Sequence, residues 1–255
     1  MVIKLVLIDK LPMKESIISR YKKYVREMVK GFQSTLIQFN KLRNYDNRIE
    51  ISIRGPEEVF IKNLLMIEVG IVQNFKDIEI GMRLKGNLVD VGKVGFGLFV
   101  DCGILNPKVD VLISLNTLRE QLCKGKEKST PEIIKAYDFI NDFPLNIKIT
   151  SIDREKGNLK GLLEPNILSL YNKLIKENLE AVFLSGETKA QLKKVLEKTD
   201  HLRDIISIKK YGFLENIIIL KDTTDAPGII SEIGRYLKNC RLSAIRPERI
   251  KKLWE

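Results

Sequence analysis

Residues 75–165 consist mainly of five short β-type segments with glycine turns. In chain order the segments read MRLKGNLVDV, GLFVDCG, VDVLIS, LNIKITSID and NLKGLLE. Five strands of this length with glycine turns are typical of a small β-barrel. A polar, partly helical stretch separates the third segment from the fourth. We therefore predict a small five-stranded barrel in this part of the chain.

The segments on either side of the barrel follow a different pattern. Residues 1–74 read as strand, helix, strand, strand and helix, and residues 166–255 repeat this logic before ending in RLSAIRPERIKKLWE. This alternation is typical of a small α/β sandwich of ferredoxin-like type. The predicted fold class is α+β, a central five-stranded β-barrel flanked by two small ferredoxin-like α/β domains, with boundaries at 1–74, 75–165 and 166–255.

The charge of the chain favours a polyanionic partner. Its 255 residues carry a formal net charge of +11 at pH 7, and the pI is about 9.4. The net charge is +5 in residues 1–74, +1 in 75–165 and +5 in 166–255. If the partner is nucleic acid, we expect the flanking domains to contact phosphates and the barrel to contribute base stacking.

The cysteine spacing and the lengths of the apolar runs indicate the cellular compartment in which we expect the protein. Cys102, Cys123 and Cys240 show no CxxC spacing, which favours a reducing interior without a disulfide framework or a structural zinc site. The opening MVIKLVLIDKLPMKES turns charged after a short apolar run, and no run approaches the length of a membrane span. We expect a cytoplasmic protein without membrane contact.

The stretch VGKVGFGLFVDCG places two aromatic rings among glycines at the start of a strand. Alternation along the strand turns Leu98 and Val100 inward and Phe99 outward. Phe96 shares the face of Phe99 only if the chain bends at Gly95 or Gly97, which glycine permits. Two rings on one wet surface would form a platform for base stacking. The alternative is that Phe96 caps the barrel and Phe99 packs against a neighbouring domain.

The span GMRLKGNLVDVGKVGFGLFVDCG, with VDVLIS and LNIKITSIDREKGNLKGLL, resembles the RNA-binding domain named after ribosomal protein S-one, an OB-type β-barrel. The resemblance covers about a third of the chain and all five strands in order. It implies stacking by Phe96 and Phe99, and a role for Asp153 and the basic turn around Gly157. The whole chain is also similar to an uncharacterised archaeal family that carries this domain in the middle.

Two positions depart from the pattern of that domain, because Leu112 stands where a histidine is usual and Asn158 where an arginine is usual. These departures predict a weaker or less typical RNA site. The candidate RNA-binding residues are Phe96, Phe99, Lys93, Arg83, Lys85, Asp153, Arg154, Lys156 and Asn158.

Two further segments are candidates for binding. The basic end of the chain, near Trp254, would contact phosphates or a ribosomal surface, or is simply a solvated charge run. The turn DAPG, with Asp225, Pro227 and Gly228, resembles the amino-acid-binding turn of ACT regulatory domains; the alternative is an ordinary strand-to-helix turn. The candidate phosphate or ribosome contacts are Arg241, Arg246, Arg249, Lys251 and Lys252.

The sequence shows no catalytic or metal-binding constellation. His201 is the single histidine, HExxH is absent, and GKVGFG lacks the GxxxxGK[ST] pattern of a phosphate loop. We predict a non-enzymatic protein without cofactor or metal that binds single-stranded or ribosomal RNA, or ribosomal subunit proteins, in translation. The alternative is a protein-interaction or small-ligand-sensing module. The sequence does not determine whether chains pair.

Overall fold

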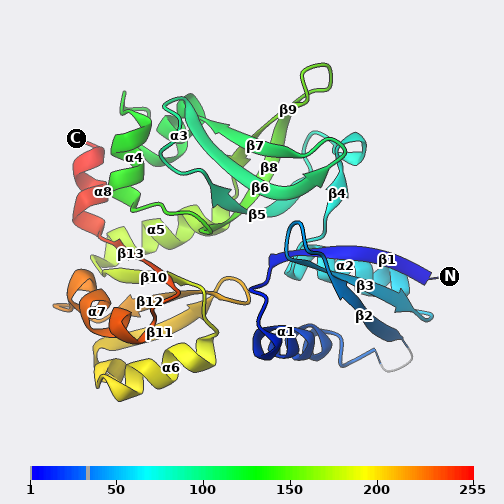
Figure 1. The fold of residues 1–255 in the computed structure, drawn as a ribbon. Coiled ribbons are helices and arrows are strands. Elements are labelled where there is room, and N and C mark those ends of the chain that lie inside the picture. The colour runs from blue at the N-terminus through cyan, green and yellow to red at the C-terminus, as the bar shows by residue number, and fades with distance from the viewer. Residues whose placement is uncertain (1, 33–34) are drawn as a thin grey trace. The chain divides into compact units, whose positions relative to one another are not determined.

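A computed structural model describes residues 2–32 and 35–255 (Figure 1). The chain forms two compact units. The first comprises residues Met1–Ile78, Leu84–Gly86 and Cys102–Val109, and the second comprises Glu79–Arg83, Asn87–Asp101 and Asp110–Glu255. The domain boundaries expected from the sequence stay a prediction. Among the described residues, no helix is both long and apolar enough to cross a membrane.

The first unit is built on a three-stranded antiparallel sheet with the order β1-β3-β2. After α2 the chain returns beside β1, where Leu7 and Ile71 form an isolated antiparallel bridge. This is a βαββαβ arrangement in which the fourth strand is reduced to a bridge. The elements are β1 (Val2–Lys10), α1 (Glu15–Met28), β2 (Leu36–Leu42), β3 (Arg48–Arg54), α2 (Glu58–Glu68), β4 (Gln73–Asn74) and η1 (Phe75–Asp77).

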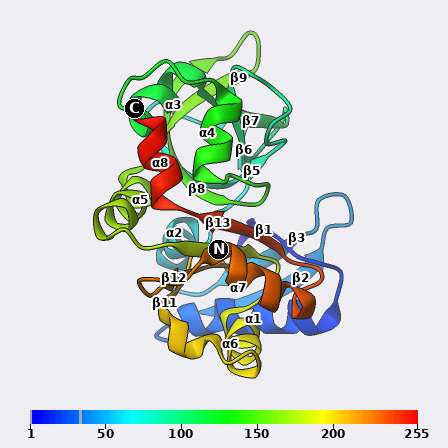
Figure 2. The same cartoon turned by 90° about the vertical axis from the view of Figure 1, so that its left-hand side faces the viewer.

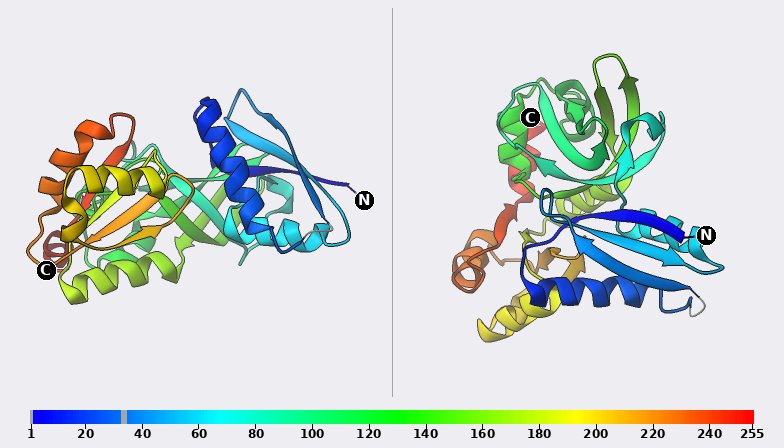
Figure 3. Two further views of the ribbon diagram at one scale, coloured as in Figure 1. Left: turned by 90° about the horizontal axis from the view of Figure 1, so that it is seen from below. Right: turned by 45° about the vertical axis from the view of Figure 1, so that its right-hand side comes forward.

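The core of this unit lies on one face of the sheet, where α1 packs (Figure 3). Ile17, Tyr21 and Val25 recur at four-residue spacing on α1 and are buried. Ile51 and Ile53 of β3 are fully buried as well. Side chains on the other face of the sheet are exposed, so this sheet is covered by its own helices on one side only.

The barrel predicted from the sequence is confirmed. Five strands follow the order β6-β5-β8-β9-β7, and β6 also pairs with β7, which closes the barrel. Leu98 and Val100 are buried, as the alternation predicted. The strands are β5 (Arg83–Val89), β6 (Gly97–Leu105), β7 (Val109–Ser114), β8 (Pro144–Asp153) and β9 (Asn158–Leu163).

Two short helices occupy the polar stretch between β7 and β8. They are α3 (Leu115–Leu122) and α4 (Thr130–Tyr137). The hydroxyl of Ser114 accepts the Thr117 N–H at the start of α3, and a reciprocal Ser129–Glu132 capping box begins α4.

A second βαββαβ arrangement follows the barrel in the sequence and lies in the second unit. Its sheet is antiparallel with the order β11-β12-β10-β13, the order of ferredoxin-like folds. Two helices, α5 and α8, were not among the predicted elements, and α8 lies beside α4 and α5 (Figure 2). The elements are α5 (Pro165–Glu177), β10 (Ala181–Ser185), α6 (Lys189–Lys198), η2 (His201–Asp204), β11 (Ile205–Lys210), β12 (Glu215–Leu220), α7 (Ala226–Ile233), η3 (Gly234–Tyr236), β13 (Arg241–Ile245) and α8 (Pro247–Leu253).

Both faces of this second sheet are covered. On one face, Leu192 and Leu196 of α6 and Ile229 of α7 belong to a buried apolar cluster. On the other, Phe183 of β10 packs against Phe143, with ring centroids 4.4 Å apart. The C-terminal arrangement and the helices around the barrel therefore share a core.

Candidate nucleic-acid interface

The two phenylalanines singled out from the sequence lie against each other at the start of β6. Their ring centroids are 6.0 Å apart and the ring planes meet at 90°. Phe96 is 56% exposed and Phe99 is half-buried. In this edge-to-face pair the Phe96 ring is the more open one. One ring is therefore available for stacking, supported at its side by the other.

Gly97 explains how the rings come together. A Cβ atom at Gly97 would lie 2.2 Å from the carbonyl oxygen of Ile113 in β7, and φ at this glycine is +156°. Only glycine allows this close approach of β6 to β7. Gly95 has no such constraint, because a Cβ atom there would meet no atom within 4 Å. The bend predicted at Gly95 or Gly97 thus depends on Gly97.

Strand pairing places a further cation two strands away from β6. The Leu115 N–H donates to the Phe96 carbonyl (2.8 Å), and β7 pairs with β6. Leu112 of β7 lies opposite the exposed Lys160 in the parallel pairing of β7 with β9. With strands about 4.8 Å apart, β9 is roughly 10 Å from β6 across β7.

The predicted basic turn leads into β9. Asn158 lies opposite Asp153 and, two residues before Lys160, points to the same side of β9. The Asp153 carboxylate accepts the Lys156 N–H (3.0 Å), so it closes the turn. Arg154 and Lys156 are exposed.

Three further predicted cations, Lys93, Arg83 and Lys85, have protein partners. Lys93 pairs with Asp90 (2.6 Å), and Arg83 pairs with Glu164 (3.4 Å), although both basic side chains remain at least 70% exposed. Lys85, in the first unit, donates to the carbonyl of Glu68. Burial lowers the pKa of Lys85, and the acidic charge of Glu68 opposes this shift. Lys85 is therefore engaged within its own unit.

A basic loop missed by the sequence analysis precedes α4, whose first residue bonds to the segment that carries Phe96. The Thr130 hydroxyl donates to the carbonyl of Gly95 (2.7 Å), which joins the start of α4 to the segment that carries Phe96. The preceding loop exposes Lys124 and Lys126. Its sequence, CKGKEKS, shows the charge, but only the fold joins the residue after it to the segment that carries Phe96.

The cations near the end of the chain lie on ordered elements. Arg241 forms an ion pair with Asp142, and Lys251 donates to Asn178 Oδ1 (2.7 Å). The Trp254 indole donates to the Leu122 carbonyl (2.7 Å). The Arg246 and Arg249 side chains are partly buried, and Lys252 is exposed. A role of these cations in phosphate binding stays a prediction.

The DAPG turn begins α7. The Asp225 carboxylate accepts the Gly228 N–H, and Glu180 accepts the Ala226 N–H, each at 2.7 Å. Pro227 occupies the first helical turn, where its missing N–H costs nothing. Two donors that a ligand at this turn would need are already used by protein carboxylates.

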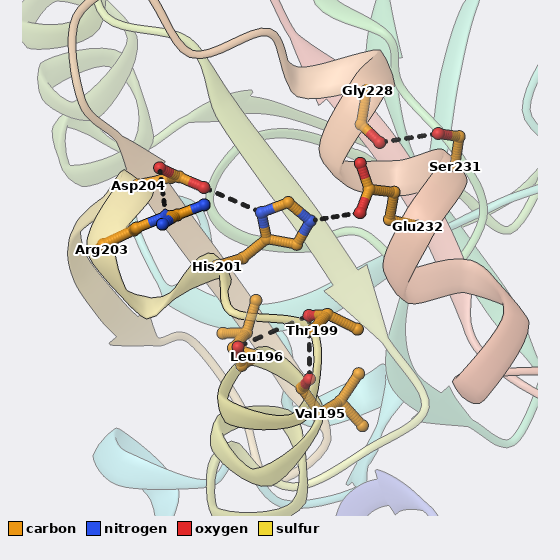
Figure 4. Close-up of polar contacts among 9 residues, drawn as sticks. All are labelled: Val195, Leu196, Thr199, His201, Arg203, Asp204, Gly228, Ser231 and Glu232. Carbon is orange, nitrogen blue, oxygen red and sulfur yellow. Dashed lines mark hydrogen bonds and ion pairs between the residues drawn. The ribbon is translucent and has the colours of Figure 1, made fainter.

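His201 links two elements of the C-terminal sheet domain (Figure 4). Its Nδ1 lies 2.8 Å from Asp204 Oδ2, and its Nε2 lies 3.0 Å from Glu232 Oε2 of α7. Burial acts to lower the pKa of His201, but the two carboxylates outweigh it and raise the pKa above its ordinary value. The histidine thus has a structural environment. Among the described residues, no group of three metal-ligating side chains could hold a metal ion.

Comparisons with known proteins give partial matches. The uncharacterised protein MJ1198 from Methanocaldococcus jannaschii is similar at 16% identity over 35% of this chain and 97% of that chain, with a TM-score of 0.24. GSP13 from Bacillus subtilis is similar at 15% identity over 36% of this chain and 59% of that chain, with a TM-score of 0.25. No curated protein matches. Residues 179–245, which contain the second βαββαβ arrangement, match the family model of the DUF2110 C-terminal domain.

Proposed function

We propose that the protein binds single-stranded RNA on the outer surface of its barrel and has no catalytic activity of its own. The observation that carries this proposal is the exposed ring of Phe96, held edge-to-face with Phe99. An aromatic ring open to solvent accepts a base of any identity by stacking, for about 1–3 kcal/mol. The resemblance of the barrel sequence to the S-one type domain supports the same ligand.

The cations around the rings supply the second part of the argument. Lys160 lies on β9, across β7 from the strand of Phe99, Arg154 and Lys156 extend from the adjoining turn, and Lys126 lies in the loop joined to Gly95. This arrangement suits a strand whose base stacks on Phe96 while its phosphates run over β7 and β9. The ligand we propose is therefore a short single-stranded segment, such as an exposed loop of ribosomal RNA.

Titration of a fluorescein-labelled, mixed-sequence 12-nucleotide RNA, followed by anisotropy, tests the proposal. We expect the dissociation constant to increase by about 5- to 100-fold for Phe96→Ala, since stacking is lost. Phe60→Ala is the matched control, because Phe60 is 57% exposed on α2 and lies outside the barrel strands. Unaltered RNA binding by Phe96→Ala, with the variant folded, would refute the proposed site.

The small-ligand alternative predicts a different result. A free amino acid bound at the DAPG turn would raise the melting temperature of the full chain, and Asp225→Ala would abolish that rise. RNA binding would then be negligible, which separates the two functions in one set of titrations.

A further inference from the structure

Among the residues that the structure describes, the sheet of the first unit has one strand edge without backbone partners. β2 is the outermost strand in the order β1-β3-β2. Within residues 2–32 and 35–255, its backbone hydrogen bonds run toward β3 only. An unpaired strand edge presents a row of N–H and C=O groups that a further strand can pair with.

The other outer edges of the two sheets are each engaged. Beside β1, the Val72 N–H donates to the Val6 carbonyl (2.9 Å). At β11, the Lys189 ammonium donates to the Ile208 carbonyl (2.7 Å), and at β13 the Asp138 carboxylate accepts the Ala244 N–H (2.6 Å). Since these edges carry such contacts, the bare edge of β2 is the exception.

A groove of about 450 Å³ runs alongside this edge, between β2 and the first turns of α1. It is mainly apolar, and its exposed rim includes Met13, which is 69% exposed. The lining residues are Met13, Glu15, Ile18, Lys22, Phe39, Asn40, Lys41, Leu42 and Ile49. A strand added at β2 would direct every second side chain into this groove, because side chains alternate along a strand.

Cations surround the groove. Arg26 lies over the Phe39 ring at 5.1 Å from its centroid, and Lys22 lies over it at 6.0 Å. On the opposite face of the sheet, Lys4 and Arg54 line a shallow hollow of about 420 Å³ that also includes Leu36 of β2. Glu15 is the acidic residue in the groove lining. Both faces next to the edge therefore favour carboxylates on an incoming strand.

We propose that the β2 edge and this groove bind an extended peptide segment of a partner protein in which apolar and acidic residues alternate. Its backbone would pair with Leu36–Phe39, the part of β2 before the register shift between Phe39 and Leu42. Apolar side chains would enter the groove, and the alternating carboxylates would point to the opposite face of the sheet, toward Arg54 and Lys4. This inference is independent of the RNA-binding proposal, which concerns the barrel.

Charge and shape favour this occupant over two others. A second copy of the chain, paired through β2, would bring its own Lys22, Arg26 and Arg54 toward like charges. A nucleic acid would find no open ring among the described residues that line the groove, because cations lie over the Phe39 ring. The outward side chains of β2, Leu36 and Gln38, are not aromatic. A peptide matches the backbone edge, the apolar groove and the cations together.

Selection of a phage-displayed library of random nonapeptides against the full chain tests the proposal. We expect enriched sequences that alternate apolar residues with Asp or Glu. A synthetic peptide of the enriched sequence should slow hydrogen exchange at the amides of Leu36–Phe39 on binding. Methylation of its alternate backbone nitrogens should abolish binding, since main-chain pairing is then blocked.

Charge reversal in the first unit provides the matched variants. Arg54→Glu should weaken peptide binding by about tenfold, whereas Lys23→Glu, on α1 and outside both linings, should leave it within about twofold. Failure to enrich any sequence, enrichment of basic sequences, or equal effects of both variants would overturn the proposal. Slowed hydrogen exchange at Leu36–Phe39 on addition of the 12-nucleotide RNA, but not of the peptide, would also overturn it. So would a dimer of the chain in sedimentation that Met13→Glu dissociates. RNA binding at Phe96 would be unaffected by any of these results.

Discussion

At the scale of single residues, the candidate RNA site depends on a glycine as much as on the aromatic rings. Gly97 lets β6 approach the Ile113 carbonyl, and this approach sets Phe96 and Phe99 edge-to-face. A larger residue would separate the two strands or twist the start of β6. The aromatic platform and barrel closure therefore share one steric requirement.

Gly97→Ala should lower the free energy of unfolding by about 2–4 kcal/mol, since the new Cβ atom would clash with backbone and the φ angle is unfavourable for alanine. Gly95→Ala is the control, because its Cβ atom would meet nothing within 4 Å, and it should change stability by less than about 0.5 kcal/mol. Urea unfolding of both variants measures the difference. Equal stability of the two would show that the close approach to Ile113 is absent.

His201 gives the C-terminal sheet domain a pH dependence. Because its pKa is raised in the folded state, the stabilisation is fully present below the unfolded pKa of about 6.5 and is lost as the pH rises through the folded pKa. We expect the melting temperature to fall over this range of rising pH. In His201→Gln this component should vanish. If the melting temperature of His201→Gln still varies with pH as in the original protein, another group causes the pH dependence.

At the scale of elements, the basic end of the chain is a docked helix rather than a free tail. Ile250 and Leu253 of α8 are buried, and the Trp254 indole donates to the carbonyl of Leu122, the last residue of α3. The Lys124 ammonium lies over the Trp254 ring, 3.9 Å from its centroid. Through Trp254, the residue after α8, the C-terminal helix thus contacts both the end of α3 and the basic loop before α4.

Trp254→Ala should lower the free energy of unfolding by roughly 1–3 kcal/mol, because it removes this hydrogen bond and the ring contact. Lys252→Ala, at an exposed position on the same helix, should alter stability by less than about 0.5 kcal/mol. Thermal or urea unfolding compares them. If Lys252→Ala weakens RNA binding without loss of stability, α8 contacts phosphates, as the sequence predicted. If neither stability nor binding changes in either variant, α8 is not docked.

At the scale of the whole molecule, the distribution of charge predicts how RNA affinity responds to salt. The chain carries a net charge of +11, and each phosphate contact to a single strand contributes about −0.7 to the slope of log K against log salt concentration. The slope therefore counts phosphate contacts without depending on which base stacks on Phe96.

Lys160→Gln should make this slope shallower by about 0.7, since one phosphate contact is removed. Lys173→Gln, on α5 and 54% exposed, removes the same charge away from the strands of the barrel and should leave the slope unchanged. Anisotropy titrations at several salt concentrations provide the slopes. Equal slopes for both variants would indicate that RNA binding depends on the net charge of the chain and not on the position of Lys160.

The local patterns of the sequence predicted most of the elements. Short β-type segments with glycine turns identified the five barrel strands, and the order strand, helix, strand, strand and helix expected of both flanks is present. These features depend on windows of about ten residues, in which backbone propensity and burial of one face agree. Strand β13 and helices α5 and α8 were not predicted. Helix α8 packs against α4 and α5, so its apolar face has a partner only in the folded chain.

The chain by itself placed Phe96 and Phe99 on either side of Gly97 and Leu98, and it predicted a bend there. Tertiary structure decided what adjoins this segment: β9, which carries Lys160, pairs in parallel with β7, and Thr130, which follows the basic loop, bonds to Gly95. It also decided that, among the described residues, the outer edge of β2 has no hydrogen-bond partner while β11 and β13 carry side-chain contacts. The physical reason is that the neighbours of a strand follow from the packing free energy of the whole core, which no local window of sequence contains.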